Sequence, residues 1–475
     1  MDYEKELLKA KELCNDRPDE ALRILNSIMN EDFDGKHGQM ALFMSGYLMM
    51  QAEKYGLAYH IYKRCQQLNP NISEIYSNMG MCLEQHSPKK AIECFNKATQ
   101  LNPNNANSYA NEGLIYLQMA KPDKCIELCD KALLINPSLK SAIHNKGLAQ
   151  LMLKDYENGW KNYAYTLGVK HREIREYGLP DWNGEPGRVV VYGEQGVGDE
   201  IMFASCLPDM MKTNEVFLDC DSRLKTLFQR SFGLPTYGTR FTDQFPVMEH
   251  KPEYQCAIGQ LPSFYRKTKN DFPGTPYLTP CLERSLMWRA LFDTFDGLKI
   301  GIAWSGGIKE TGQKKRTLSP SDFESVFNKK DTFICLEYNP VSRETLEKYS
   351  LKHYPNFTGK GQDIDELAAL ISQLDLVITA CTTVVYIAGA LGVPCHVLVP
   401  EEPGYRYGLE GGFDWYYSVK LIRQKGTWKK TIEKQNYDKY LYRLRPKGNH
   451  RLSCAMPLNT QTKQSTSAFY ADKQI

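Results

Sequence analysis

The sequence predicts a protein of the α plus α/β class, in which a helical repeat solenoid precedes two doubly wound α/β lobes. Three observations lead to this prediction. The chain has 475 residues, more than one hydrophobic core usually organises. Its first third repeats Gly and Pro with a period of 33 to 34 residues, and after residue 187 short β-branched runs alternate with helical patterns.

The repeat is carried by an Asn-Pro pair and by a glycine that recurs in step with it. The prolines are Pro70, Pro103 and Pro137, and the glycines are Gly46, Gly80, Gly113 and Gly147. Each proline ends the second helix of a unit, and each glycine lets that helix cross the first one closely. A small residue and then an aromatic residue or cysteine follow each of the first three glycines. This is the tetratricopeptide pattern, and it predicts a solenoid over residues 1–172, with worn outer units at 3–34 and 140–167.

A solenoid of this kind buries its apolar faces only by stacking, so it forms one superhelical arm. The concave groove of such an arm typically binds an extended peptide or another protein. A rigid spacer without a ligand is the alternative, because the repeat fold alone names no function.

The helical period stops after Tyr177, and turn-forming residues fill 180–187. The run Arg188–Tyr192 reads as a buried parallel strand, and it leads into a glycine-rich turn at 193–199 and a helix from Glu200. Strand, glycine-rich turn and helix is the form of a nucleotide-type binding loop. The glycines allow close backbone approach, and the helix start offers unpaired N–H groups.

Further strands are expected along the rest of the chain. They are Val216–Cys220, Tyr254–Ile258, Leu298–Trp304, Thr332–Glu337, Leu376–Thr379 and His396–Val399. We expect one lobe at 187–290, a second at 297–435, and a disordered tail at 436–475, which loses periodicity. Ligands of open parallel sheets lie beyond the carboxyl ends of the strands, so the cleft between the lobes is the expected site.

A second turn of this kind lies within 375–392, where a buried strand runs into Thr382 and Thr383 at the start of a helix. Two hydroxyls and the free N–H groups at the positive end of a helix dipole suit a diphosphate. Alternatively, the two threonines are only helix caps.

A third turn follows the strand that ends at Trp304 and contains Gly306. The cationic triplet Lys314-Lys315-Arg316 comes shortly after it. A cation placed there would neutralise a leaving diphosphate. The alternative is a solvated loop, the usual environment of a charge run.

The overall composition argues against several functions. A net charge of +3 makes a nucleic-acid binder unlikely. Fourteen scattered cysteines without a CxxC pair suit free thiols in a reducing cytosol, and we expect neither a metal site nor a cofactor. The charged N-terminal helix is unlike a signal peptide, and no stretch approaches the roughly 18 apolar residues of a membrane span. The expected location is therefore cytoplasmic.

Three segments carry a resemblance to a known family: GEQGVGDEIMFAS, GIAWSGG…KKRTLSPSDFESVF and DIDELAALISQLDLVITACTTVVYIAGALGVP. They are similar to tetratricopeptide glycosyltransferases related to the heptosyltransferases, and the domain order resembles that of O-linked N-acetylglucosamine transferases. The resemblance covers roughly residues 40–435. It implies a GT-B fold of two Rossmann-like lobes and metal-independent, inverting transfer from a nucleotide sugar to a protein, peptide or glycan hydroxyl.

The resemblance also assigns site residues. Asp199 matches the aspartate proposed to deprotonate the acceptor. Arg316 matches the basic residue that contacts the donor phosphates, and Thr382 and Thr383 match the phosphate-and-sugar helix. From their positions in the expected cleft we add Tyr386, Trp304 and Gly306 to the donor side. We likewise expect the acceptor or cleft side to comprise Glu194, Gln195, Gly196, Gly198 and Arg406, the last of which follows the last strong strand. The chain departs from the family at Tyr386, where a histidine is usual, and at Cys381, where an aspartate is frequent. A tyrosine can donate a hydrogen bond to phosphate but carries no positive charge.

Two competing interpretations stay open. The first is a scaffold that keeps the fold without turnover, which the departure at Tyr386 favours. The second, sugar transfer to nucleic-acid bases, is disfavoured by the balanced charge. The run Asp219-Cys220-Asp221 resembles a metal-binding DxD motif, but we interpret it as a strand end and a helix cap.

Overall fold

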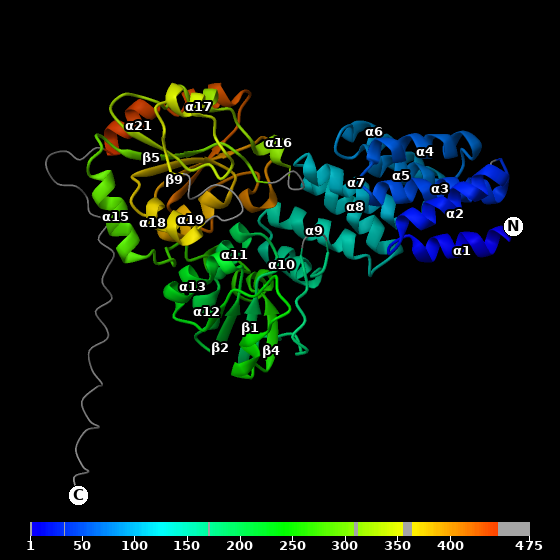
Figure 1. The fold of residues 1–475 in the computed structure, drawn as a ribbon, viewed down its shortest axis with the longest axis horizontal. Coiled ribbons are helices and arrows are strands. Elements are labelled where there is room, and N and C mark those ends of the chain that lie inside the picture. The colour runs from blue at the N-terminus through cyan, green and yellow to red at the C-terminus, as the bar shows by residue number, and fades with distance from the viewer. Residues whose placement is uncertain (1, 33, 170–171, 308–311, 355–362, 445–475) are drawn as a thin grey trace, which may run out of the picture.

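The computed structural model describes residues 2–32, 34–169, 172–307, 312–354 and 363–444. A helical arm extends from one side of a body made of two α/β lobes (Figure 1). The N-terminus lies at the far end of the arm, and the two lobes lie one against the other beside its last helices.

Paired helices form the arm, as the glycine and proline period predicted. They are α1 (Tyr3–Leu13), α2 (Pro18–Asp32), α3 (Lys36–Gln51), α4 (Tyr55–Leu68), α5 (Ser73–Leu83), α6 (Pro88–Leu101), α7 (Ala106–Gln118), α8 (Pro122–Ile135), α9 (Lys140–Met152) and α10 (Tyr156–Tyr165). A Cβ built on Gly46 would meet the ring of Tyr62, and one on Gly80 would meet the ring of Phe95. The predicted role of these glycines, room for the facing helix, is thus confirmed.

The first lobe is built on a parallel sheet of four strands in the order β3-β2-β1-β4. The strands are β1 (Arg188–Tyr192), β2 (Glu215–Asp219), β3 (Thr236–Tyr237) and β4 (Tyr254–Ala257). Its helices are α11 (Val197–Ala204), α12 (Leu207–Met210), α13 (Lys225–Phe232) and α14 (Pro262–Tyr265), with short 3₁₀ turns between them, among them η1 (Ser222–Leu224). β1 is central, and all of its residues after Arg188 are buried, as expected for a parallel strand covered on both faces.

The second lobe has a parallel sheet of six strands in the order β10-β9-β8-β5-β6-β7. The strands are β5 (Lys299–Ala303), β6 (Thr332–Cys335), β7 (Lys352–His353), β8 (Leu376–Ala380), β9 (Cys395–Val399) and β10 (Val419–Arg423). The helices are α15 (Leu282–Phe292), α16 (Gln313–Arg316), α17 (Arg343–Lys348), α18 (Ile364–Ile371), α19 (Thr383–Leu391), α20 (Trp428–Glu433) and α21 (Tyr437–Leu444), with the 3₁₀ turn η8 (Tyr405–Tyr407).

Two predicted boundaries are corrected. The first lobe does not continue to residue 290, because α15 packs on α18 of the second lobe, with Trp288 Nε1 donating to Glu366. The tail does not begin at 436, since α21 covers Tyr437–Leu444 and buries Tyr437 and Leu441 against the second sheet. Aromatic and leucine residues at helical spacing explain that helix. The remainder of the predicted tail, 445–475, lies outside the described residues.

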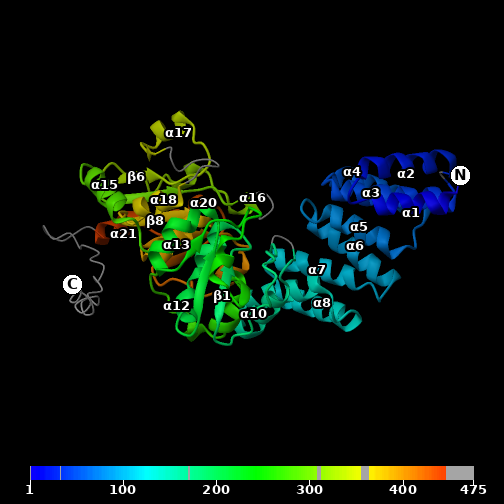
Figure 2. The same cartoon turned by 60° about the horizontal axis from the view of Figure 1, so that its bottom comes forward.

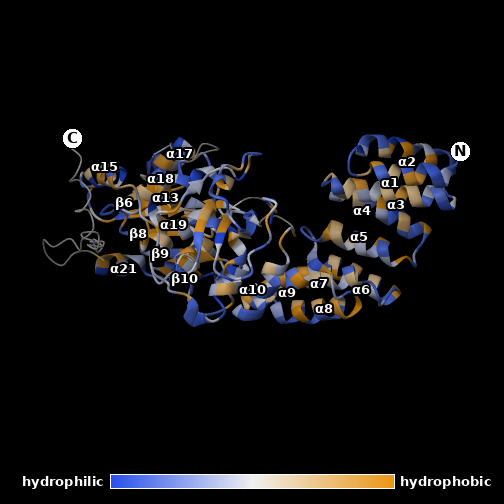
Figure 3. Ribbon diagram, turned by 90° about the horizontal axis from the view of Figure 1, so that it is seen from below, coloured by the Kyte–Doolittle hydropathy of each residue, from blue (hydrophilic) through white to orange (hydrophobic). Residues whose placement is uncertain are grey.

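One hydrophobic cluster joins all three parts of the chain. It contains Trp160 and Tyr163 of α10, Phe203 of α11 and Trp415 of the second lobe. Hydrophobic and hydrophilic residues alternate along the arm helices (Figure 3). Within the described residues, no helix combines the length and the apolar character that crossing a membrane requires.

Candidate functional site

The site begins at the turn between β1 and α11. Helix α11 starts at Val197 with Gly196 as its N-cap, so Asp199 lies in the first turn of the helix. The helix therefore begins three residues before Glu200, where the sequence predicted its start. Its carboxylate lies near the positive end of the helix, where a negative charge is stabilised.

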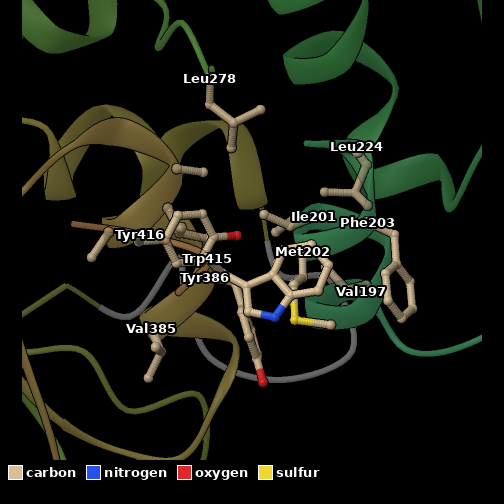
Figure 4. Packing of buried hydrophobic residues seen from close by; sticks show 14 of the residues in the cluster. Val197, Ile201, Met202, Phe203, Leu224, Leu278, Val385, Tyr386, Trp415 and Tyr416 are labelled. Carbon is tan, nitrogen blue, oxygen red and sulfur yellow. The ribbon is translucent and has the colours of Figure 1, made fainter. Parts of the chain in front are cut away.

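Gly198 brings the two lobes into contact. A Cβ at this position would lie 2.9 Å from the ring of Tyr386 and 3.3 Å from Oγ1 of Thr383, both on α19. Figure 4 shows α11 side chains, including Ile201 and Met202, directed toward Tyr386. This glycine thus makes room for the opposite lobe, whereas the sequence suggested room for a ligand.

Asp199 forms an ion pair with Arg406 of η8, which belongs to the second lobe. Each side chain keeps about a fifth of its surface exposed, 21% for Asp199 and 22% for Arg406. The Nε–H of Arg406 is buried and has no hydrogen-bond partner in the described part of the chain. A carboxylate at this position is the type of group that acts as a general base.

The donor-side residues of the second lobe lie at the carboxyl ends of β5 and β8. Arg316 donates to the backbone oxygen of Cys381 at 3.2 Å, directly before Thr382. Thr382 is the N-cap residue of α19, but its side chain makes no capping hydrogen bond. The helix-cap alternative is therefore correct for the position of Thr382, but the Thr382 hydroxyl does not itself cap the helix.

Two other residues predicted for the donor side, Gly306 and Trp304, pack beneath the strand end that carries Arg316. The N–H of Gly306 donates to Thr317 at 3.1 Å, and a Cβ at Gly306 would collide with the backbone of Arg316. Trp304 is only 8% exposed and belongs to the hydrophobic core of the second lobe. Its predicted contact with the donor stays a prediction. Burial raises the pKa of the Tyr386 hydroxyl, which keeps it a neutral hydrogen-bond donor.

Glu194 and Gln195 do not line a cleft, contrary to the prediction. Glu194 is fully buried, pairs with Arg172 at 3.6 Å and accepts from the N–H of Gly259 at 3.2 Å. The amide of Gln195 donates to the hydroxyl of Tyr163, in the last arm helix. Both side chains thus fix the turn against the arm instead of facing an acceptor.

A second buried charge pair, which was not predicted, lies beneath the turn. Glu200 is fully buried and lies 2.6 Å from Arg240, and it also accepts from the N–H of Asp221 at 3.0 Å. Burial raises the pKa of Glu200 to about 8, and the nearby Arg240 opposes this increase. The one signal in the sequence was Glu200 itself, because a glutamate within an apolar helical run needs a buried cation as its partner.

The two aspartates of the DxD-like run have structural roles. Asp219 is fully buried and binds Arg175 at 2.9 Å and the hydroxyl of Tyr177 at 2.8 Å. Asp221 caps η1 by accepting from the N–H of Arg223. The interpretation as a strand end and a helix cap agrees with these contacts.

The lobe contact therefore joins Gly198 and Asp199 to Thr383, Tyr386 and Arg406, with Arg316 and Thr382 at the adjacent strand end. Carboxylate, guanidinium groups and a helix N-terminus are the groups that general-base catalysis and anion binding require. A small hollow next to Arg406 is lined by Lys154 and Trp160 of the arm and by Asp414. Its lining residues place it between the arm and the second lobe.

Comparisons with known proteins identify the arm. Residues 81–119 match the family described as TPR repeat, and residues 106–139 match the tetratricopeptide repeat. The N-terminal arm is therefore a tetratricopeptide solenoid, and the region after it is α/β with parallel sheets.

The chain is similar to protein FlbA of Caulobacter vibrioides, with 28% identity over 303 residues. The match covers 58% of this chain and 50% of FlbA, so the chain spans about half the length of that curated relative. Among solved structures it is similar to a tetratricopeptide repeat protein of Parabacteroides merdae, with 20% identity, 35% of this chain, 66% of that chain and a TM-score of 0.30. It is also similar to pilF of Pseudomonas aeruginosa, with 19% identity, 36% of this chain, 78% of that chain and a TM-score of 0.32.

Proposed function

We propose that this protein is a glycosyltransferase of the GT-B type, which binds a nucleotide sugar between its lobes and transfers the sugar to a hydroxyl group. One observation carries the proposal. The turn after β1 and the start of α19 after β8 come from different sheets, yet they meet at Gly198 and Tyr386 with charged groups beside them. Ligands of open parallel sheets bind at such strand ends.

The residues divide into two roles. On the donor side, the diphosphate would lie on the N-terminus of α19, with the hydroxyls of Thr382 and Thr383 as donors and Arg316 as the cation. On the acceptor side, Asp199 would take the proton as the acceptor oxygen bonds to the anomeric carbon. The bond from that carbon to the diphosphate oxygen breaks as the new bond forms, and Arg316 stabilises the charge of the leaving nucleoside diphosphate.

The Asp199–Arg406 pair has to change in this reaction. Arg406 holds Asp199 while the lobes touch, and a donor diphosphate would attract the same guanidinium. Donor binding would therefore separate the lobes at Gly198 and transfer Arg406 from the carboxylate to the phosphate. The unpartnered Nε–H of Arg406 supports this second contact.

The arm would present the acceptor. Tetratricopeptide repeats suggest a protein partner, and the final repeat contacts the turn that carries Asp199 through Tyr163 and Gln195. A protein, peptide or glycan held in the arm would thus end close to the proposed base.

A second candidate function is a scaffold that binds partners without turnover. Two observations favour it: Tyr386 replaces a histidine of the family, and the ion pair occupies Asp199. The two candidates differ in whether nucleoside diphosphate is released.

The test is a thermal-shift screen with UDP-, GDP-, ADP- and CMP-sugars, with and without EDTA. It is followed by measurement of the released nucleotide, which is a nucleoside diphosphate for the first three donors and CMP for the last. A donor at 100 times its Kd should stabilise the protein by about 2.7 kcal/mol. Arg316→Ala should lose the shift, whereas Asp199→Asn should keep it and lose release. Exposed Arg343→Ala and Asp243→Asn are the matched controls. No shift with any donor would refute the proposal, and binding without release would favour the scaffold.

A further inference from the structure

The last repeat of the arm contacts the two segments that form the Asp199–Arg406 pair. Tyr163 of α10 accepts a hydrogen bond from the amide of Gln195, in the turn that leads to Asp199. Helix α9 packs against η8, the short turn that contains Arg406. The arm meets the body at this repeat in both views of the molecule (Figures 1 and 2). Both members of the ion pair therefore lie on segments that the arm holds.

The loop between β9 and β10, which carries Arg406, is joined to the arm by one carboxylate. The side chain of Asp414 is only 8% exposed, and it accepts from Lys154 Nζ at 2.8 Å and from the Tyr156 hydroxyl at 2.5 Å. Lys154 also donates to the backbone oxygen of Gly412 at 3.0 Å. Hydrogen bonds to an ionised group are stronger than those between neutral groups. Asp414 thus attaches the loop to the turn between α9 and α10.

The backbone of this loop is shaped to approach Lys154. Gly408 and Gly411 have φ angles of +58° and +75°, in the region that favours glycine. A Cβ on Gly408 would lie 3.2 Å from Cε of Lys154, and one on Gly411 would lie 3.3 Å from its Nζ. From the other side, Arg423 of β10 donates to the backbone oxygens of Tyr407 and Gly408, both at 2.8 Å. The loop is therefore held between its own sheet and the arm.

The guanidinium of Arg406 depends on this loop for its position. It pairs with Asp199, it lies 4.5 Å from the centre of the Tyr405 ring, and its Nε–H has no hydrogen-bond partner among the described residues. Tyr405 in turn packs against the hydrophobic cluster of the last arm repeats. A functional side chain keeps its place only when the groups behind it are held. Releasing the loop from the arm would therefore release the guanidinium.

We infer that Asp414 is a positioning residue of the proposed transferase. Through Lys154 and Tyr156 it fixes the loop to the arm, and this keeps the Arg406 guanidinium within reach of Asp199 and of a donor diphosphate. The backbone stays in place while the side chain of Arg406 exchanges one partner for the other. The role toward the diphosphate rests on the proposed function, whereas the placement of Arg406 on Asp199 is testable without a donor.

A double-mutant cycle on the full chain tests this placement. Asp199→Asn breaks the ion pair and should lower the melting temperature by roughly a few degrees. In an Asp414→Asn chain the loop is no longer held, so Asp199→Asn should lower the melting temperature by less than about half as much. Asp130→Asn is the matched control, because Asp130 pairs with the arm residue Lys146 at 2.6 Å instead of with the loop. In that background the effect of Asp199→Asn should be unchanged.

The affinity for a nucleoside diphosphate gives the second readout. Isothermal titration with UDP, GDP and ADP identifies the one that binds the unaltered chain. Asp414→Asn and Lys154→Met should each raise its Kd about tenfold, because both release the loop. Lys154→Arg should keep the original affinity, since arginine donates to the same oxygens. In an Arg406→Ala background, Asp414→Asn should have no further effect.

Three results overturn the inference. Asp199→Asn has the same effect with and without Asp414; it has no effect in the unaltered chain; or Asp414→Asn weakens nucleotide binding equally in the Arg406→Ala background, which means that it acts by another route. If none of the three nucleotides binds the unaltered chain, the proposed function fails, and the melting-temperature cycle alone decides how Arg406 is placed.

Discussion

The arm and the first lobe both use glycine to let a large side chain approach, but the side chain differs. In the arm, Gly46 and Gly80 make room for aromatic rings of the facing helix. In the lobe, Gly193 makes room for the Glu200 carboxylate, and Gly259 makes room for that of Glu194. The same residue type thus serves close apolar packing in one region and a buried charge in the other. Substituting such a glycine should reduce stability more in the lobe than in the arm, because a displaced buried charge loses its partner.

The largest effect should come from removing a charge partner in the lobe. Above pH 8, where Glu200 is ionised, Arg240→Met leaves this carboxylate buried without its cation, and we expect the free energy of unfolding to fall by about 3–5 kcal/mol in urea titration. The double variant with Glu200→Met should recover much of the loss. Exposed Arg343→Met should change stability by less than about 0.5 kcal/mol. A loss below about 1 kcal/mol for Arg240→Met would remove the proposed difference between the regions.

Adding a methyl group at Gly193, beside the Glu200–Arg240 pair, should reduce stability slightly less. A Cβ at Gly193 lies 2.3 Å from the carboxylate carbon of Glu200, so Gly193→Ala should destabilise by about 3 kcal/mol through overpacking and displacement of the charge. Gly196→Ala in the same turn is the control, since its nearest neighbour is 3.5 Å away. Thermal unfolding of the two variants side by side measures the contrast, and equal shifts would contradict it.

The buried acid also predicts a pH dependence. The pKa of Glu200 is raised to about 8 in the folded state, so between pH 4.5 and 8 the folded chain holds a proton that the unfolded chain has released. Stability should therefore fall as pH rises through this window. Glu200→Gln should flatten the profile measured by thermal unfolding. Glu112 in the arm, with a pKa raised to about 7 by burial, adds a slope of the same sign that remains in the variant.

The smallest effect is expected in the arm. A Cβ at Gly80 lies 2.7 Å from the ring of Phe95, and this crowding outweighs the better helix propensity of alanine. Gly80→Ala should thus destabilise by about 1 kcal/mol. Gly56 has no neighbour within 4 Å of a built Cβ, so Gly56→Ala should stabilise by about 0.5 kcal/mol. If both variants shift the unfolding temperature in the same direction, packing at the repeat glycines is not what they measure.

The sequence predicted the arm well because its signals are local: each glycine meets a residue 15 or 16 positions later, within one repeat. Central strands such as β1 were found as buried β-branched runs. β10 was missed because it is an edge strand carrying Lys420 and Arg423. Edge strands keep polar residues and therefore lack that pattern.

The site was predicted in part. Asp199 and Arg406 were both named, but their ion pair joins residues 207 positions apart and depends on how the lobes pack. Arg172 and Arg240 were missed altogether, because a single arginine in a loop carries no signal of the buried carboxylate that it meets. Glu194 and Gln195 were misplaced because a glycine-rich turn suggests an open binding loop, whereas Gly259 lets the carboxylate turn inward.

The cluster shared by α10 and both lobes decides how such an arm can be exchanged between proteins during evolution. Lys154 and Tyr156 both bind Asp414 of the second lobe. The final repeat is therefore part of the packed core of the lobes as well as the end of the arm. A recombination event that joined a foreign solenoid at residue 172 would remove the aromatic residues that α10 contributes to this shared core. We therefore expect exchange of repeat units to be tolerated only upstream of α9. Lineages that vary the length of the arm should insert or delete units there.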